Sequence, residues 1–286
     1  MLPDHSGGWL ALGWMAGTRN GRWGAARYGR GVLTQEQVDR YWADGFLAIE
    51  RLIGPDEVKR LRTAYDEIID GTVASATQRM LGGITRQVMV PSMVHPAFDR
   101  NAALDAGREV MHDLFGCAHA NRVFDMLIDK PAGHPHETPW HQDASYMQVP
   151  TTPAGFRMPL TQVQFWIALD DVDVDNGCMQ FVPGQHHGGT AAHVVASGDP
   201  DDSGRLLAYA DVAEARPEMA VACPLPAGGA TIHTAMTPHS TGPNTTVDRA
   251  RRAYIFNLTA ADVPDDRLQD HLRADYVRNP GKVRVP

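Results

Sequence analysis

From residue 120 onward, the chain is divided into short apolar segments separated by proline and glycine clusters. These segments are VFDMLID, QVQFWIAL, CMQFVP, MAVACPL, ATIHTAM and RAYIFNL. Short apolar segments with turn residues between them are typical of strands in a β-barrel or β-sandwich. The pattern predicts a mainly β fold, a barrel or a double-sheet jelly roll, with its core at about 120–260.

The segment QVQFWIAL indicates which side chains lie on each face of its expected strand. Neighbouring residues in a strand point to opposite faces of the sheet. One face carries Gln162, Gln164 and Trp166, and the other carries only apolar side chains. We therefore expect the polar face to line a ligand site and the apolar face to pack against helices.

The part of the chain before the expected core has helical patterns. Thr34 and Gln37 form a capping box, which marks the start of a helix. Apolar residues recur at helical spacing further along, and Gly71 follows one of these stretches. We expect these helices to cover the outer face of one sheet. The sequence predicts helices over 35–44, 55–70 and 102–115, and a strand over 46–49.

The domain organisation follows from the same patterns. Residues 1–31 are rich in glycine, arginine and tryptophan without a regular period, so we expect a disordered extension. Residues 32–286 are expected to form one domain. Within it, residues 184–218 are rich in Gly, Asp, Pro and Ala, and we interpret them as a lid-like insertion between strands.

Composition excludes several classes of function. The net charge is −8 and no basic run occurs, which disfavours nucleic-acid binding. No apolar run approaches the roughly 18 residues needed to cross a membrane. Three widely spaced cysteines indicate a reducing compartment, so we expect a cytoplasmic protein. The excess of arginine over lysine suggests a GC-rich bacterial genome. Nothing in the sequence indicates an oligomeric state.

A metal-binding pattern lies within the expected core. His141 and Asp143 are two residues apart in PWHQD, and His239 follows far downstream in TPHSTGPN. Residues i and i+2 of a strand share a face, so His141 and Asp143 should point to one position while Gln142 points away. Two histidines and one carboxylate form the facial triad that binds non-haem Fe(II). His233 competes with His239 for the third position, because an even spacing gives both the same face.

Four ordered segments resemble the phytanoyl-CoA dioxygenase-like branch of the Fe(II)/2-oxoglutarate oxygenases. The segments are PWHQD, FWIALDDVDVDNGCMQFVPGQH, HSTGPNTT and DRARRA, and a weaker match, YWADGFLAIERLIGPDEVKRLR, lies at 41–62. One short motif is frequent by chance, whereas four in order are not. The resemblance favours His239 over His233, because HSTGPN matches the family pattern after the second histidine.

The resemblance also implies a site for 2-oxoglutarate. An arginine fork suits the distal carboxylate of a keto acid. The family pattern places this arginine at Arg251, although the adjacent Arg252 stays an alternative because only one of the two can face inward. Thr241 is similar to the hydroxyl residue that shares the carboxylate. Trp166 and Met126 resemble residues that line the same pocket.

The resemblance implies a double-stranded β-helix (a cupin-like jelly roll) and the activity of a 2-oxoglutarate-dependent non-haem iron dioxygenase. It would use Fe(II), 2-oxoglutarate and O2 to hydroxylate an unactivated carbon of a small organic molecule, with release of succinate and CO2. Two alternatives are a zinc-dependent hydrolase, since the same ligands bind Zn(II), and a jelly roll that binds a small molecule without catalysis. The sequence does not distinguish hydroxylation from desaturation, cyclisation or epimerisation.

The substrate is expected to be a free small molecule rather than a CoA ester. Residues 144–160 contain one basic residue, Arg157, and the insertion carries more acidic than basic residues, which disfavours a polyphosphate. Polar and apolar side chains near the metal pattern are the candidate substrate contacts. They are Gln162, Gln164, Tyr146, Met147 and Phe156.

Overall fold

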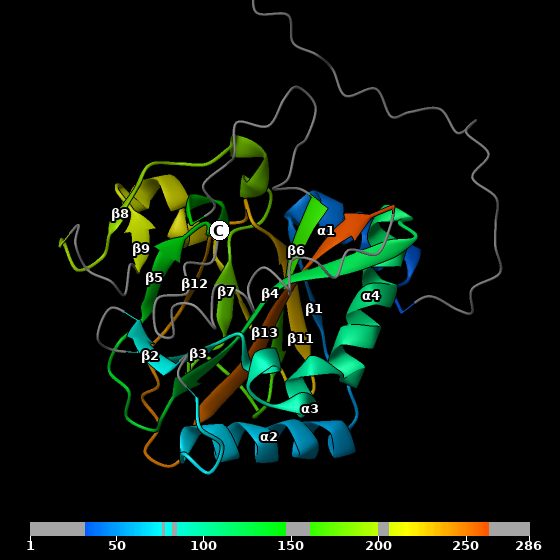
Figure 1. Cartoon of the computed structure of the whole chain (residues 1–286). Helices are drawn as coiled ribbons and strands as arrows, with labels where there is room; N and C mark the ends of the chain where they lie inside the picture. The colour runs from blue at the N-terminus through cyan, green and yellow to red at the C-terminus, as the bar shows by residue number, and fades with distance from the viewer. Residues whose placement is uncertain (1–31, 76–77, 82–84, 147–160, 200–205, 263–286) are drawn as a thin grey trace, which may run out of the picture. The chain divides into compact units, whose positions relative to one another are not determined.

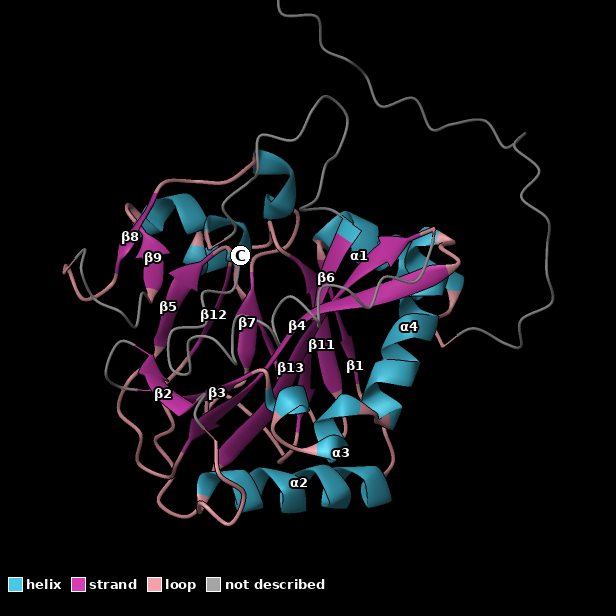
Figure 2. Ribbon diagram, viewed as in Figure 1, coloured by secondary structure: helices cyan, strands magenta, loops and turns pink. Residues whose placement is uncertain are grey.

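The computed structural model describes residues 32–75, 78–81, 85–146, 161–199 and 206–262. The expected N-terminal extension at 1–31, and the candidates Met147 and Phe156, lie outside these ranges. The predicted fold class is confirmed, because most elements are antiparallel strands arranged in two facing sheets (Figures 1 and 2).

The first sheet has seven strands in the order β1-β11-β6-β13-β4-β3-β2. Its strands are β1 (Phe46–Ile49), β11 (Ala230–Thr234), β6 (Gln162–Ala168), β13 (Arg251–Ala261), β4 (His119–Lys130), β3 (Thr85–Met89) and β2 (Gln78–Leu81). All its pairs are antiparallel. The hairpin β2–β3, which extends the sheet beyond β4, was not predicted from the sequence.

The second sheet has four strands in the order β10-β7-β12-β5. They are β10 (Val221–Cys223), β7 (Met179–Phe181), β12 (His239–Thr241) and β5 (Thr138–His141). Because β12 lies beside β5, His239 is directly opposite His141 in the register. The two sheets together give the jelly roll that the sequence predicts.

The predicted helices are confirmed almost to the residue. They are α1 (Gln35–Asp44), α2 (Pro55–Ile69) and α4 (Ala102–Phe115), together with the short α3 (Pro96–Asp99). Thr34 and Gln37 make both hydrogen bonds of the capping box. Figure 1 shows α2 and α4 beside the seven-stranded sheet, as expected for helices that cover its outer face.

The alternation predicted for β6 separates two apolar cores. Phe165 packs in the same cluster as Leu61 of α2 and Leu104 of α4, on the outer face of the sheet. Trp166 faces the other way and clusters with Phe181 between the two sheets. Burying each apolar side chain of this size contributes roughly 1.5–3 kcal/mol. The inner face of the seven-stranded sheet therefore looks into the space where the polar candidates lie.

The described parts of the insertion, 184–199 and 206–218, are ordered around a hairpin. The hairpin consists of β8 (His193–Val195) and β9 (Leu207–Tyr209). Three short 3-10 helices flank it: η3 (Gln185–Gly188), η4 (Val212–Ala215) and η5 (Pro217–Met219). Gln142 fixes this segment, because its side chain donates to Gly189 O at 2.8 Å and accepts from Ala191 N at 2.8 Å. The insertion is thus attached directly beside His141, and a role as a lid stays a prediction.

Gly45 links the end of α1 to the segment before β12. It ends the helix with φ +84°, a left-handed conformation that favours glycine. Its carbonyl accepts from Thr237 Oγ1 at 2.7 Å and from Thr234 N at 3.1 Å. A side chain at this position would overlap the His186 ring. In the described part of the chain, no helix is long and apolar enough to cross a membrane.

Candidate metal centre

The structure brings His141, Asp143 and His239 together at one end of the inter-sheet space. One ligand atom of each lies within 4.8 Å of the others. Asp143 Oδ1 is 3.8 Å from His141 Nε2 and 3.7 Å from His239 Nε2. The reasoning from strand parity was wrong in one respect, since β5 ends at His141 and Asp143 begins the turn η2 (Asp143–Ser145). The turn, not the strand, brings the carboxylate back to the imidazole.

Hydrogen bonds orient both candidate histidine ligands in the same way. His141 Nδ1 lies 2.8 Å from Pro139 O, and His239 Nδ1 lies 2.9 Å from Thr237 O. A carbonyl only accepts, so each Nδ1 carries the proton and each Nε2 offers a lone pair. Burial lowers the pKa of both imidazoles, which favours the neutral form that binds metals.

The carboxylate of Asp143 uses its two oxygens differently. Oδ1 faces the two histidines, whereas Oδ2 lies 2.5 Å from Gln164 Nε2 and 3.4 Å from His233 Nε2. Burial opposes ionisation of Asp143, but the surrounding imidazoles outweigh it and keep its pKa below the usual range. Gln164, predicted as a substrate contact, donates to this carboxylate, and its contact with a substrate stays a prediction. His233 is fully buried beside it, a position that its even spacing from His239 had suggested.

Arg251 and Arg252 face opposite sides of β13. Arg252 points outward, where it bonds Asp170 at 2.7 Å and Asp66 at 2.8 Å. Arg251 is 1% exposed and lies over the Trp166 ring, with 5.4 Å between its Cζ and the ring centroid. Its Nε and Nη1 have no hydrogen-bond partner among the described residues. A buried guanidinium without acceptors has lost its hydration and gained no hydrogen bond in return, which is unfavourable. An anionic ligand bound beside Arg251 would supply the missing acceptors.

Thr241 is bonded to a residue that sequence reasoning missed. Its Oγ1 accepts from Lys130 Nζ at 2.8 Å. Lys130 is opposite Arg251 in the register of β4 and β13, so the two side chains share a face. The sequence motifs gave no indication of this lysine. Lys130 and Thr241 are far apart in the sequence and meet only in the folded protein.

The remaining candidates occupy different places. Met126 is opposite Ile255 in the register and packs against the inner core. Gln162 is buried at the start of β6, on the face that carries Gln164. Tyr146 is half-exposed, its ring lies against His141 at 5.8 Å, and its hydroxyl accepts from Leu207 N at 2.8 Å. Tyr146 therefore joins the metal segment to the insertion.

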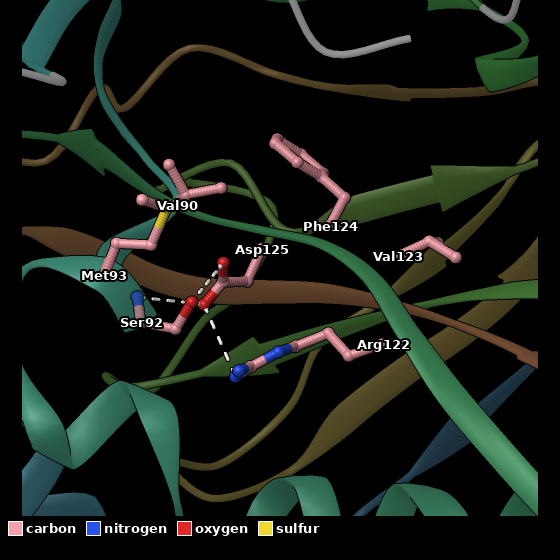
Figure 3. Close-up of a pocket in the computed structure, with 7 residues that line it drawn as sticks. All are labelled: Val90, Ser92, Met93, Arg122, Val123, Phe124 and Asp125. Carbon is pink, nitrogen blue, oxygen red and sulfur yellow. Dashed lines mark hydrogen bonds and ion pairs between the residues drawn. The ribbon is translucent and has the colours of Figure 1, made fainter. Parts of the chain in front are cut away.

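Two pockets formed by described residues lie apart from this group. A small one, about 10 Å³, is lined by Val90, Met93 and Phe124 around Asp125 (Figure 3). A larger groove, about 680 Å³, runs between α2 and α3. Neither is lined by a candidate ligand. The candidate site is therefore defined by the metal-ligand atoms of His141, Asp143 and His239, and not by either pocket.

The fold and the site together define a class. A jelly roll with a buried two-histidine, one-carboxylate group is the arrangement of non-haem Fe(II) oxygenases. The additional buried arginine, free to take a carboxylate, is what a keto-acid cosubstrate requires.

Comparison with known proteins gives the family. The sequence model of phytanoyl-CoA dioxygenase (PhyH) matches residues 41–253, so the chain belongs to this family. It is 24% identical to the zebrafish (Danio rerio) phytanoyl-CoA dioxygenase domain-containing protein 1, over 81% of this chain and 91% of that protein. The mouse (Mus musculus) peroxisomal phytanoyl-CoA dioxygenase is 28% identical, over 57% of this chain and half of that enzyme.

Solved structures of similar fold agree with this assignment. EvdO2 from Micromonospora carbonacea var. aurantiaca, complexed with 2-oxoglutarate, is 29% identical with a TM-score of 0.67, over 83% of this chain and 96% of that one. The epimerase SnoN, in complex with Fe3+, alpha ketoglutarate and nogalamycin RO, is 26% identical with a TM-score of 0.58, over 79% of this chain and 83% of that one. The chain is an iron- and 2-oxoglutarate-dependent oxygenase, with His141, Asp143 and His239 as its candidate iron ligands.

Proposed function

We propose that this protein is a dioxygenase that hydroxylates an unactivated carbon of a small organic molecule and releases succinate and CO2. The observation that carries the proposal is the coincidence, in one inter-sheet space, of the His–Asp–His group and the buried, unpartnered guanidinium of Arg251. When bound, the iron supplies the oxidation chemistry, in which O2 oxidises 2-oxoglutarate and the substrate together.

The protein's own residues have distinct roles in this proposal. His141 and His239 offer Nε2 to the metal because their Nδ1 atoms are bonded to main-chain carbonyls. Asp143 completes the ligand set with Oδ1. Arg251, with Thr241, binds the distal carboxylate of 2-oxoglutarate. Trp166 supports the guanidinium plane through the ring contact described above.

The proposed substrate is a free small molecule rather than a CoA ester. Among the described residues of the insertion, Asp199, Asp211, Glu214 and Glu218 outnumber the single arginine, Arg216. That balance opposes a polyphosphate at the edge of the site. The nogalamycin RO in the SnoN complex supports a free small molecule, because SnoN is similar to this chain in sequence and fold.

The test is release of succinate from 2-oxoglutarate. With Fe(II) and O2, a panel of free acids, glycosides and polycyclic natural products should include compounds that stimulate succinate release, and mass spectrometry should find a product heavier by one oxygen. The matched CoA esters should not stimulate it. Hydrolysis with Zn(II) and no succinate with Fe(II) would favour the zinc hydrolase. Ligand binding with neither activity would favour the non-catalytic jelly roll.

A further inference from the structure

Lys130 is an unexpected residue in the interior of this chain. The protein has only three lysines, Lys59, Lys130 and Lys282. Lys130 is 0% exposed at the end of β4, and it lies opposite Arg251 in the register with β13. Two cations directly opposite each other in a sheet repel, and both are removed from water here. When both groups are charged, such an arrangement is stabilised by a nearby anion.

In the described part of the protein no carboxylate forms an ion pair with Lys130, although Glu137 is near enough to raise its pKa. Lys130 Nζ donates to Thr241 Oγ1 at 2.8 Å and to Gly242 O at 2.7 Å, which are neutral acceptors. Its remaining contact, with Thr241 O, is long at 3.5 Å. No ion pair between described residues includes Lys130 or Arg251. Two nitrogens of the Arg251 guanidinium, Nε and Nη1, lack an acceptor among the described residues.

We propose that Lys130 is a second positive anchor for the distal carboxylate of 2-oxoglutarate, acting beside Arg251. The proposal rests on the proposed function, because it assigns a further residue to the same cosubstrate site. Lys130 acts in two ways. Its charge adds to that of Arg251, and its bond to Thr241 Oγ1 occupies that oxygen as an acceptor. The Thr241 hydroxyl hydrogen is then left to donate to the carboxylate.

The titration of Lys130 agrees with this role. Burial and, after it, the positive charge of Arg251 lower the pKa of Lys130 to about 6, although Glu137 opposes the change. A neutral amine has two N–H groups, which match the two short bonds to Thr241 and Gly242. Protonation adds the third donor. We therefore expect ligand binding near pH 7.5 to take up a proton, since a neighbouring carboxylate favours the charged form.

The experiment compares two ligands on the full-length protein loaded with Ni(II), which does not turn over. The first is 2-oxoglutarate, and the second is 2-oxopentanoate, which has a methyl group in place of the distal carboxylate. Calorimetry would measure both for the wild type and for Lys130→Met. We expect the variant to bind 2-oxoglutarate on the order of tenfold more weakly, with binding of 2-oxopentanoate unchanged. The exposed Lys59→Met variant is the matched control and should bind both as the wild type does.

A second variant separates charge from structure. Lys130→Gln keeps a neutral N–H that can bond Thr241, so a lysine that only ties β4 to β12 would be replaced by it. We expect Lys130→Gln to lose affinity for 2-oxoglutarate as Lys130→Met does, and to lose the proton uptake seen with buffers of different ionisation enthalpy. This readout also decides the matter if the methionine variant folds poorly.

The outcomes distinguish a failure of the proposed 2-oxoglutarate site from a failure of the role proposed for Lys130. If the wild type binds both ligands equally, the assignment of 2-oxoglutarate is wrong. If the wild type prefers 2-oxoglutarate and Lys130→Gln keeps that preference and the proton uptake, Lys130 is a structural tie and the present inference is overturned. Equal loss of affinity for both ligands in Lys130→Gln would overturn it as well.

Discussion

Gln164 donates a hydrogen bond to one oxygen of Asp143, and the other oxygen is left facing the histidines. The bond joins Nε2 to Oδ2 at 2.5 Å, and His233 approaches the same oxygen at 3.4 Å. Gln164 and His233 are opposite each other in the register of β6 and β11. A carboxylate restrained in this way presents Oδ1 to a metal in a fixed direction.

The first prediction concerns this restraint. Gln164→Leu keeps the volume of the side chain but removes the donor, so Asp143 should lose its orientation. We expect Fe(II) or Co(II) to bind about 10–100-fold more weakly, as is usual for partners of metal ligands. Titration against a chelator would measure it. Gln162→Leu, on the same face of the same strand, is the control and should keep the wild-type metal affinity.

The second prediction distinguishes His239 from His233 as the third metal ligand. Replacing His239 with alanine should remove most of the bound iron, because its Nε2 faces Asp143 Oδ1 with its proton fixed on Nδ1. His233→Ala should keep one equivalent of iron, bound more weakly. Metal analysis after dialysis would show the difference. The reverse order of loss would move the ligand role to His233.

The third prediction separates the two adjacent arginines. Removing the buried Arg251 should raise the apparent KM for 2-oxoglutarate at least about tenfold, since a buried carboxylate would lose its partner. Arg252→Met should leave that KM unchanged. It should instead lower the free energy of unfolding by roughly 1–3 kcal/mol, because Asp170 and Asp66 lose their hydrogen bonds. An increase of the KM in the Arg252 variant alone would contradict the assignment.

The fourth prediction concerns pH and the small pocket of Figure 3. Asp125 is 1% exposed, it accepts from Ser92 Oγ at 3.0 Å, and Arg122 lies 3.8 Å away. Burial raises its pKa from 3.8 to about 6, although Arg122 and Ser92 oppose the change. Between these values, the folded state binds more protons than the unfolded state, so stability should fall as pH rises.

The measurement for this prediction is urea unfolding at several pH values between about 4 and 7. The stability of the wild type relative to Asp125→Asn should decrease with increasing pH, by at most about 1.4 kcal/mol per pH unit. Asparagine cannot ionise, so the variant lacks this contribution. A difference between the two proteins that does not depend on pH would show that Asp125 titrates normally.

The fifth prediction compares two glycines. Gly45→Ala should cost roughly 1–3 kcal/mol, because a side chain at positive φ is strained and this one would meet His186 and Thr237. It should also weaken iron binding, since Thr237 O orients His239. Gly71 has a similar φ of +85° but no atom near the position of an added Cβ. Gly71→Ala should show the strain alone, with no effect on iron.

The sequence by itself determined the local elements and the chemistry of the ligands. The capping box of Thr34 and Gln37, the alternation in β6 and the residue types of PWHQD and HSTGPN depend on neighbours along the chain. Local hydrogen bonding and side-chain alternation set these features, so short-range patterns predict them. The helices, the fold class and the family followed from these patterns.

Tertiary structure alone decided which distant side chains meet. Lys130 and Arg251 face each other because β4 pairs with β13 in one register, and a shift of one residue would have turned either away. His233 and Gln164 reach Asp143 because β11 pairs with β6 and because η2 turns the carboxylate back after the strand ends. Register between strands far apart in sequence is set by the packing of whole sheets, which no short segment encodes.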